Sequence, residues 1–158
     1  MEKYREFHRR SIEDREAFWR EQATAIDWQQ PFARVLDYDK PPFARWFVGG
    51  TTNLCHNAVD RHLAGRGAQQ ALIYISTETG ERRTYTFREL HSEVNRCAAV
   101  LRGQGVARGD RVLIYMPMVP EAVFAMLACA RLGAIHSVVF GGFAAHSLAS
   151  RIDDARPK

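Results

Sequence analysis

Residues 110–142 constrain the fold more than any other stretch of the sequence. They begin with an apolar run, Val112–Met116, which has the length of a buried strand and is closed by Pro117. A second run rich in β-branched residues, Ile135–Phe140, follows after a segment of helix-forming residues. Two buried strands joined by a helix within about thirty residues predict a parallel strand–helix–strand unit.

The ends of the intervening helix are also marked in the sequence. Pro120 suits the first helical position because it has no N–H to leave unpaired, and Glu121 suits the positive end of the helix dipole. Gly133 stands where a left-handed C-terminal cap is needed. The sequence therefore predicts a helix from Pro120 to about residue 132.

Composition places the chain among globular proteins. A chain of 158 residues is long enough to bury a hydrophobic core. Its residues are 46% hydrophobic and 25% charged, a composition typical of globular and not of disordered proteins. The longest apolar run, Ala122–Ala130, is much shorter than a membrane span, and no signal peptide is recognisable at the N-terminus. We expect a cytoplasmic α/β protein with a partial parallel sheet and flanking helices, and no membrane partner.

The first half of the chain shows weaker patterns. Residues 1–30 are predicted to form a helical N-terminal segment, in which Ser11 and Asp14 resemble a capping box with Asp in place of the usual Glu or Gln. Its apolar stripe consists of Ile12, Phe18, Trp19 and Ala23. The many Pro and Gly residues of positions 31–52 predict an extended, irregular segment.

A second helix is predicted to begin after Asn53 and to run to about Ala64. Its expected inward residues are Leu54, Ala58 and Leu63. Two strand-like runs, Ala71–Ser76 and Arg82–Phe87, are joined by a turn containing Gly80 and predict a hairpin.

Two more helices are predicted after the hairpin. Thr86 and Glu89 form a complete capping box in front of a long amphipathic run that ends near Gly105. Its inward face is expected to consist of Leu90, Val94, Ala98 and Leu101. The last predicted helix covers residues 144–154.

Several alternative functions have little support in the sequence. The net charge of +4 comes from arginines scattered along the chain, whereas a nucleic-acid-binding face needs clustered ones. Cys55, Cys97 and Cys129 are widely spaced and are expected to be reduced, packed thiols. His56 and His62 have no partner at ligand spacing, so no metal site is predicted.

The turn Phe140, Gly141, Gly142 is the one candidate ligand contact. It follows a predicted parallel strand, and ligands of parallel sheets bind beyond the carboxyl ends of the strands. Glycines allow a ligand to approach the backbone, although a simple tight turn remains an alternative. Asp153 and Asp154 are better explained as a solvated helix end than as a metal site. No catalytic residue is predicted.

Three long blocks, in order, closely resemble the short-chain acyl-CoA synthetases, which are adenylate-forming enzymes. The blocks are RWFVGGTTNLCHNAVDRH (45–62), TYTFRELHSEVNRCAAVLRGQGVARGDRVLIYMPMVPEA (84–122) and LACARLGAIHSVVFGGF (127–143). They are most similar to members that activate propionate, and next to those that activate acetate. The resemblance implies that residues 1–60 are the helical and extended N-terminal segment of these enzymes and residues 61–158 the start of their large AMP-binding domain.

The resemblance also implies an activity. Members of the family use ATP and Mg²⁺ to convert a short-chain carboxylate into an acyl-adenylate, and they then transfer the acyl group to CoA. Phe140, Gly141 and Gly142 match the family's FGG turn, which borders the site for the adenine end of CoA.

The family's phosphate-binding loop and catalytic lysine have no match in this sequence. We therefore expect a truncated chain that holds no cofactor by itself, is inactive alone and leaves one side of its sheet unpaired. A stand-alone small-molecule-binding module and a purely structural domain are the alternatives.

Overall fold

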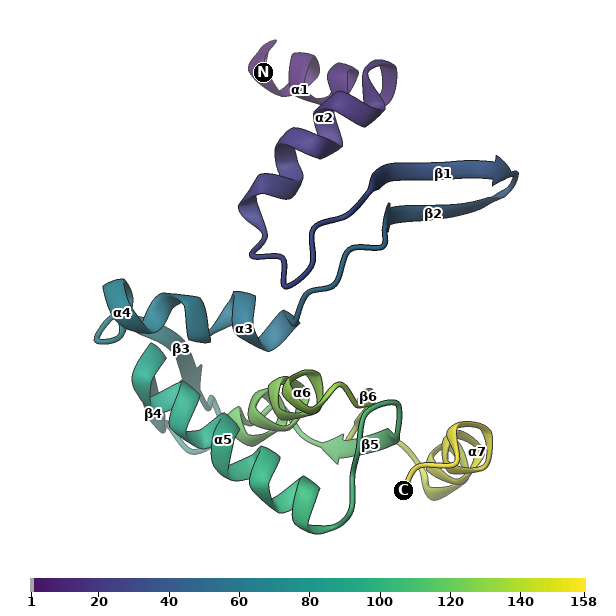
Figure 1. The fold of residues 1–158 in the computed structure, drawn as a ribbon. Coiled ribbons are helices and arrows are strands. Elements are labelled where there is room, and N and C mark those ends of the chain that lie inside the picture. Colours follow the sequence, from purple (N-terminus) through teal and green to yellow (C-terminus); the bar gives the residue numbers. More distant parts are fainter. Residues whose placement is uncertain (1) are drawn as a thin grey trace. The chain divides into compact units, whose positions relative to one another are not determined.

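The structure is a computed structural model that describes residues 2–158 (Figure 1). The chain divides into two compact units, one ending at Thr52 and the other spanning Asn53–Lys158. Within residues 2–158 the strands form three two-stranded sheets. The α/β fold class is confirmed by this arrangement of small sheets and helices.

The first unit begins with helices α1 (Glu2–Glu13) and α2 (Arg15–Gln22), followed by the short 3-10 helix η1 (Ala23–Ala25). Phe18 is almost fully buried, and its ring contacts those of Phe7 and Trp19 at centroid distances of 4.7 and 5.2 Å.

The predicted capping box at Ser11 is wrong. Ser11 lies inside α1, and its hydroxyl donates a hydrogen bond to the carbonyl of His8 at 2.7 Å. Asp14 precedes α2 without capping it through its side chain. Ion pairs between neighbouring turns stabilise α1 on both sides of Ser11, since Arg9 pairs with Glu6 and with Glu13.

Residues 31–52 are more regular than predicted, because they contain an antiparallel hairpin of β1 (Arg34–Lys40) and β2 (Phe43–Val48). Pro31 precedes β1, and the prolines of the hairpin itself occupy only the turn, where Pro41 and Pro42 are joined by a cis peptide bond. Aromatic packing supports the hairpin: Trp46 contacts Trp19 at 5.9 Å, and Phe47 contacts Trp28 at 5.4 Å and Phe32 at 5.2 Å.

The second unit begins with three short helical turns instead of one helix. These are α3 (Leu54–Ala58), η2 (Asp60–His62) and α4 (Leu63–Arg66). The predicted cap is confirmed, since the Asn53 side chain accepts a hydrogen bond from the His56 N–H at 3.2 Å. The predicted inward face is wrong at two positions: Leu54 and Ala58 are exposed, whereas Cys55 and Val59 are fully buried.

The hairpin, β3 (Gln70–Ile75) with β4 (Arg82–Thr86), is confirmed as antiparallel. Helix α5 (Phe87–Gly103) follows it, and both hydrogen bonds of the Thr86–Glu89 capping box are present. Its inward face is as predicted. Together with α3 and α6 it builds the main core, which contains Cys55, Val59, Leu90, Val94, Ala98, Phe124 and Ala128.

The strand–helix–strand unit is confirmed in detail. Strand β5 (Arg111–Met116) pairs in parallel with β6 (Ile135–Phe140), and α6 (Pro120–Leu132) joins them and packs against α5 (Figure 1). Gly133 caps α6 at φ 73°, in the left-handed region that favours glycine.

Helix α7 (Ala145–Ala155) is also confirmed. Its C-terminus is tied to the start of β5, because Arg111 donates hydrogen bonds to the carbonyls of Ala155 and Arg156 at 2.9 and 3.1 Å. Asp153 and Asp154 are exposed at this end of the helix.

Candidate functional site

The Phe140–Phe143 turn lies where the carboxyl ends of two parallel strands meet. Phe140 is paired with Met116, the last residue of β5, so both chains leave the sheet at the same edge. The Gly141 N–H donates to the Met116 carbonyl at 3.2 Å and extends this pairing by one step. The predicted position of the turn, at the carboxyl end of a parallel strand, is confirmed, and its contact with a ligand stays a prediction.

The absence of side chains on Gly141 and Gly142 leaves space that other atoms of the same chain occupy. A Cβ on Gly141 would lie 3.1 Å from the Pro117 nitrogen and 3.2 Å from the Met116 carbonyl carbon. A Cβ on Gly142 would lie 2.7 Å from Cε1 of Phe140. Gly141 therefore permits close packing against the end of β5, and Gly142 permits the observed position of the Phe140 ring.

Two aromatic rings stand at the surface of this turn. Phe140 and Phe143 are 55% and 43% exposed, and they pack edge-to-face with their centroids 6.0 Å apart. The turn is held by two hydrogen bonds, from the Phe143 N–H to the Phe140 carbonyl at 3.1 Å and from the Tyr115 hydroxyl to the Phe143 carbonyl at 3.0 Å. A pair of exposed rings in mutual contact offers a stacking surface for a planar ligand.

An apolar cavity of about 370 Å³ adjoins this aromatic pair. This volume lies at the small end of the range for small-molecule sites. The cavity is lined by the end of β5, the start of α6 and the end of β6: Met116, Pro117, Met118, Val119, Ala122, Val123, Met126, Val138, Phe140 and Phe143. Sequence reasoning missed it, because its wall combines three elements and none of them alone shows a distinctive motif.

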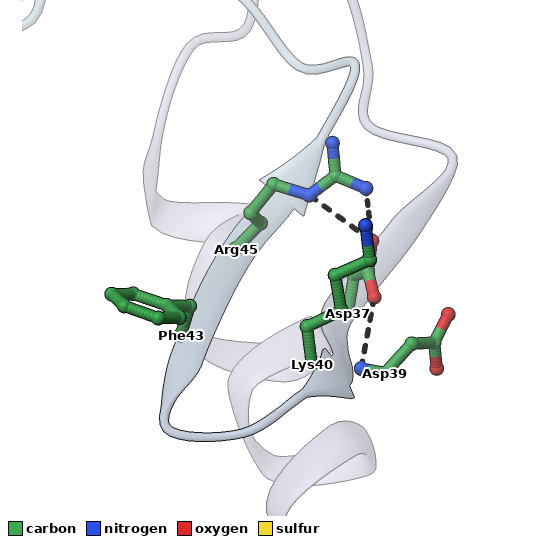
Figure 2. Close-up of a pocket in the computed structure, with 5 residues that line it drawn as sticks. All are labelled: Asp37, Asp39, Lys40, Phe43 and Arg45. Carbon is green, nitrogen blue, oxygen red and sulfur yellow. Dashed lines mark hydrogen bonds and ion pairs between the residues drawn. The ribbon is translucent and has the colours of Figure 1, made fainter.

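A second pocket, of about 360 Å³, lies on the β1–β2 hairpin and is lined by four charged residues and one aromatic residue: Asp37, Asp39, Lys40, Arg45 and Phe43 (Figure 2). Asp37 points inward from β1 and is only 6% exposed, and it is paired with Arg45 and with Arg34, the latter at 2.9 Å. The Asp39 N–H also donates to it at 3.2 Å. The hydrogen bond from Arg45, the one from Asp39 and the nearby guanidinium groups lower the pKa of Asp37 to about 2.

The Asp37 carboxylate is therefore satisfied by its own hairpin. Its partners come from the same two strands, so the pocket needs no ligand to balance the charge. The charge pattern of the sequence could have indicated this pair only if the hairpin had been predicted, since Asp37 and Arg45 become neighbours through the β1–β2 register.

A partly buried polar network joins α3, η2, α5 and α6. Arg131 donates to Cys55 Sγ at 3.2 and 3.4 Å and also binds Asp60 and Asn95. The Asn53 side chain adds a hydrogen bond to the Ala130 carbonyl at 2.9 Å. These contacts hold the short helices against the core and explain why the segment after Asn53 is ordered despite its breaks.

The cysteines are free thiols, and Cys55 and Cys129 are buried. Burial raises the pKa of all three, which disfavours the reactive thiolate. No three His, Cys, Asp or Glu side chains among residues 2–158 lie close enough together to hold a metal ion. His62, one of the two histidines considered from the sequence, packs its ring against Phe87 at 5.0 Å.

None of the helices described, from Glu2 onwards, is long and apolar enough to cross a membrane.

Two family descriptions match adjoining parts of the chain. Residues 4–58 match "Acetyl-coenzyme A synthetase N-terminus", and residues 59–158 match "AMP-binding enzyme". The second match covers more than half of the chain and includes the Phe140–Phe143 turn.

Similar proteins are found among curated sequences and solved structures. The chain is 65% identical over 154 residues to propionate–CoA ligase of Salmonella typhimurium, covering 98% of this chain and 24% of the relative. It is 52% identical over 159 residues to acetyl-coenzyme A synthetase of Methylobacterium radiotolerans, covering 99% of this chain and 24% of that relative. The solved acetoacetyl-CoA synthetase of Streptomyces lividans is 36% identical with a TM-score of 0.87, covering 95% of this chain and 23% of that one. The chain thus spans about a quarter of the length of these relatives.

Proposed function

The chain belongs to the AMP-binding enzyme family, and from this premise we propose that its protein is an acid–thiol ligase that joins a short-chain carboxylate, propionate in particular, to CoA. The observation that carries the proposal is the identity of 65% and 63% to two propionate–CoA ligases over 98% of the chain. Acetate is the competing substrate, since acetyl-coenzyme A synthetases reach 52% identity.

The proposed reaction has two steps. The carboxylate oxygen attacks the α-phosphorus of ATP, and pyrophosphate leaves as the acyl-adenylate forms. The CoA thiol then loses its proton and attacks the acyl carbon, and AMP leaves as the thioester forms. Adenylation is needed because a carboxylate oxygen is a poor leaving group, whereas AMP is a good one.

We assign the CoA contact to the turn of Phe140, Gly141 and Gly142. The exposed rings of Phe140 and Phe143 support this assignment, because they offer a stacking face for adenine at the ligand-binding edge of a parallel sheet. The glycines contribute by leaving space for the Phe140 ring and for close packing against the end of β5. Residues 1–158 supply no catalytic group in this proposal.

ATP and Mg²⁺ are not assigned to residues of this chain. Mg²⁺ prefers carboxylate oxygens and phosphate, and the carboxylates between Glu2 and Lys158 do not form a group of three that fits it. We further propose that the AMP-binding domain begins near residue 60 and that the enzyme is cytoplasmic. The match starting at residue 59 supports the boundary, and the free thiols suit a reducing compartment.

The test is ATP–pyrophosphate exchange by the complete gene product, with propionate and acetate compared at equal concentration, followed by acyl-CoA formation on addition of CoA. We expect exchange that depends on a short-chain acid and favours propionate. The isolated 158-residue chain should show no exchange, because it supplies none of the groups that act on ATP. Exchange by the isolated chain, or none by the complete product with any short-chain acid, contradicts the proposal.

A further inference from the structure

We propose that Arg151 binds a phosphate group of CoA whose adenine stacks on the Phe140–Phe143 pair. This inference rests on the proposed function and adds a specific residue to it. Arg151 lies on α7, the helix that follows the turn, and its guanidinium carbon is 5.2 Å from the centroid of the Phe143 ring. Phe143 in turn contacts Phe140, so a cation and two aromatic rings form one continuous surface.

The Arg151 side chain is held in place before any ligand binds. Its Nη1 donates to the Ser147 carbonyl at 2.8 Å and to the Ser147 hydroxyl at 2.7 Å. Phe143 covers one face of the guanidinium at the same time. An arginine fixed in this way loses little conformational freedom when it binds an anion.

Arg151 also differs from the arginines that form ion pairs in having no acidic partner among the described residues. Arg9, Arg45, Arg83 and Arg131 each pair with a carboxylate. Over the described range, residues 2–158, no carboxylate lies within ion-pair distance of Arg151, although the side chain is partly buried. A partly desolvated cation without a counter-ion is stabilised by an anionic ligand.

The chemistry of the surface matches that of the CoA nucleotide. Two exposed rings suit a purine, and a guanidinium next to them suits a phosphate, which it can bind through two N–H groups. CoA carries both groups at one end, with a 3′-phosphate and a 5′-diphosphate near the adenine.

The experiment measures the complete gene product carrying Arg151→Gln. We expect the KM for CoA to rise about tenfold or more, since a charge-assisted hydrogen bond is lost. ATP–pyrophosphate exchange without CoA should stay within about twofold, because adenylation precedes CoA binding. The matched control is Arg96→Gln on α5, which removes the same charge from an arginine paired with Glu93 and should leave the KM for CoA unchanged.

A parallel arm with 3′-dephospho-CoA identifies the phosphate. If Arg151→Gln no longer affects the KM for this analogue, Arg151 binds the 3′-phosphate; if the KM rises as it does for CoA, Arg151 binds the diphosphate. Either result supports the proposal.

Two further variants guard against a folding defect. Arg151→Lys keeps the charge without the planar fork, and Ser147→Ala releases the guanidinium without removing it, so both should raise the KM for CoA by less than Arg151→Gln. If Arg151→Gln abolishes ATP–pyrophosphate exchange, the KM for CoA of Arg151→Lys and Ser147→Ala decides whether Arg151 binds CoA. The inference is overturned if the KM for CoA is unchanged in every variant that retains ATP–pyrophosphate exchange. The proposed function is overturned if the unmodified protein shows no exchange at all.

Discussion

Gly142 is the residue on which the geometry of the proposed CoA contact depends most directly. Its missing side chain leaves the space that the ring of Phe140 occupies, since a Cβ there would lie 2.7 Å from Cε1 of that ring. Real Cβ atoms do not approach a ring so closely, so any side chain at position 142 must displace Phe140. The glycine thus acts through its neighbour as a positioning residue.

We predict that Gly142→Ala raises the KM for CoA about tenfold in the complete gene product, because the stacking face is displaced. Exchange with propionate and ATP should change little, since it does not involve CoA. Gly103→Ala is the matched control: its Cβ would meet nothing within 4 Å. Equal KM values for Gly142→Ala and the unmodified protein would remove the role assigned to this glycine.

Asp37 gives a prediction about pH. The pKa of its carboxyl is lowered from 3.8 to about 2, chiefly by the hydrogen bond from Arg45. Because the pKa is lower in the folded state than in the unfolded state, the charged carboxylate stabilises the hairpin at any pH above the pKa of the unfolded state. This contribution to stability is lost as the pH falls from about 4 to 2. The carboxyl ¹³C resonance of Asp37 should titrate near pH 2.

Hydrogen exchange of the hairpin amides provides the companion measurement. Protection of the hairpin amides against exchange should fall between about pH 4 and 2 in the unmodified chain. In Asp37→Asn this protection should be low and nearly constant over the same range. Asp39→Asn removes an exposed carboxylate 3.5 Å from Arg34 and should leave the fall unchanged. A carboxyl of Asp37 that titrates at 3.8 or above would show that the ion pair does not persist in solution.

Among the secondary-structure elements, α5 has the best-defined start. The Thr86 hydroxyl accepts a hydrogen bond from the Glu89 N–H at 3.2 Å, and Glu89 accepts one from the Thr86 N–H at 2.8 Å. Because α5 supplies Leu90, Val94 and Ala98 to the main core, a weakened start affects the whole Asn53–Lys158 unit.

We predict that Thr86→Ala lowers the free energy of unfolding by about 1 kcal/mol, the usual cost of losing an N-cap. The measurement is urea denaturation followed by far-ultraviolet circular dichroism. Ser92→Ala, at an exposed position in the middle of the same helix, should be neutral or slightly stabilising, because alanine is the better helix former there. A Thr86→Ala chain as stable as the unmodified one would mean that the capping box contributes nothing measurable.

The elements also show where sequence patterns are sufficient. Helices α5 and α6 and strands β5 and β6 carry both a periodic apolar pattern and an end signal, and all four were predicted. The β1–β2 hairpin was missed because its prolines suggested irregular structure, whereas they occupy only the turn. The Asp37–Arg45 pair and the ring contacts of Trp46 that support it depend on tertiary placement.

The inward face after Asn53 was misjudged for a related reason. Leu54 is more hydrophobic than Cys55, yet Leu54 is exposed and Cys55 is buried. Arg131 contacts Cys55 and Asp60 in the observed orientation, and it is more than 70 residues away from both in the chain. Local periodicity contains no information about such a contact.

At the scale of the whole molecule, the site itself was only partly predictable. The position of Phe140, Gly141 and Gly142 follows from a strand ending at a glycine pair, which is a local signal. The apolar cavity is not local, since its wall combines residues of β5, α6 and β6. The contact of Arg151 with Phe143 spans only eight residues, but it depends on the path of the chain from the turn into α7, which no periodic pattern shows. The sequence therefore locates the turn, and the fold supplies its surroundings.

The distribution of tryptophans has a practical consequence. Trp19, Trp28 and Trp46 are the chain's three tryptophans, and they all belong to the unit that ends at Thr52. Intrinsic fluorescence excited at the indole band therefore reports on that unit alone, while the unit from Asn53 onward carries no indole. A label-free emission spectrum can follow the melting of the unit that ends at Thr52 separately from that of the other unit.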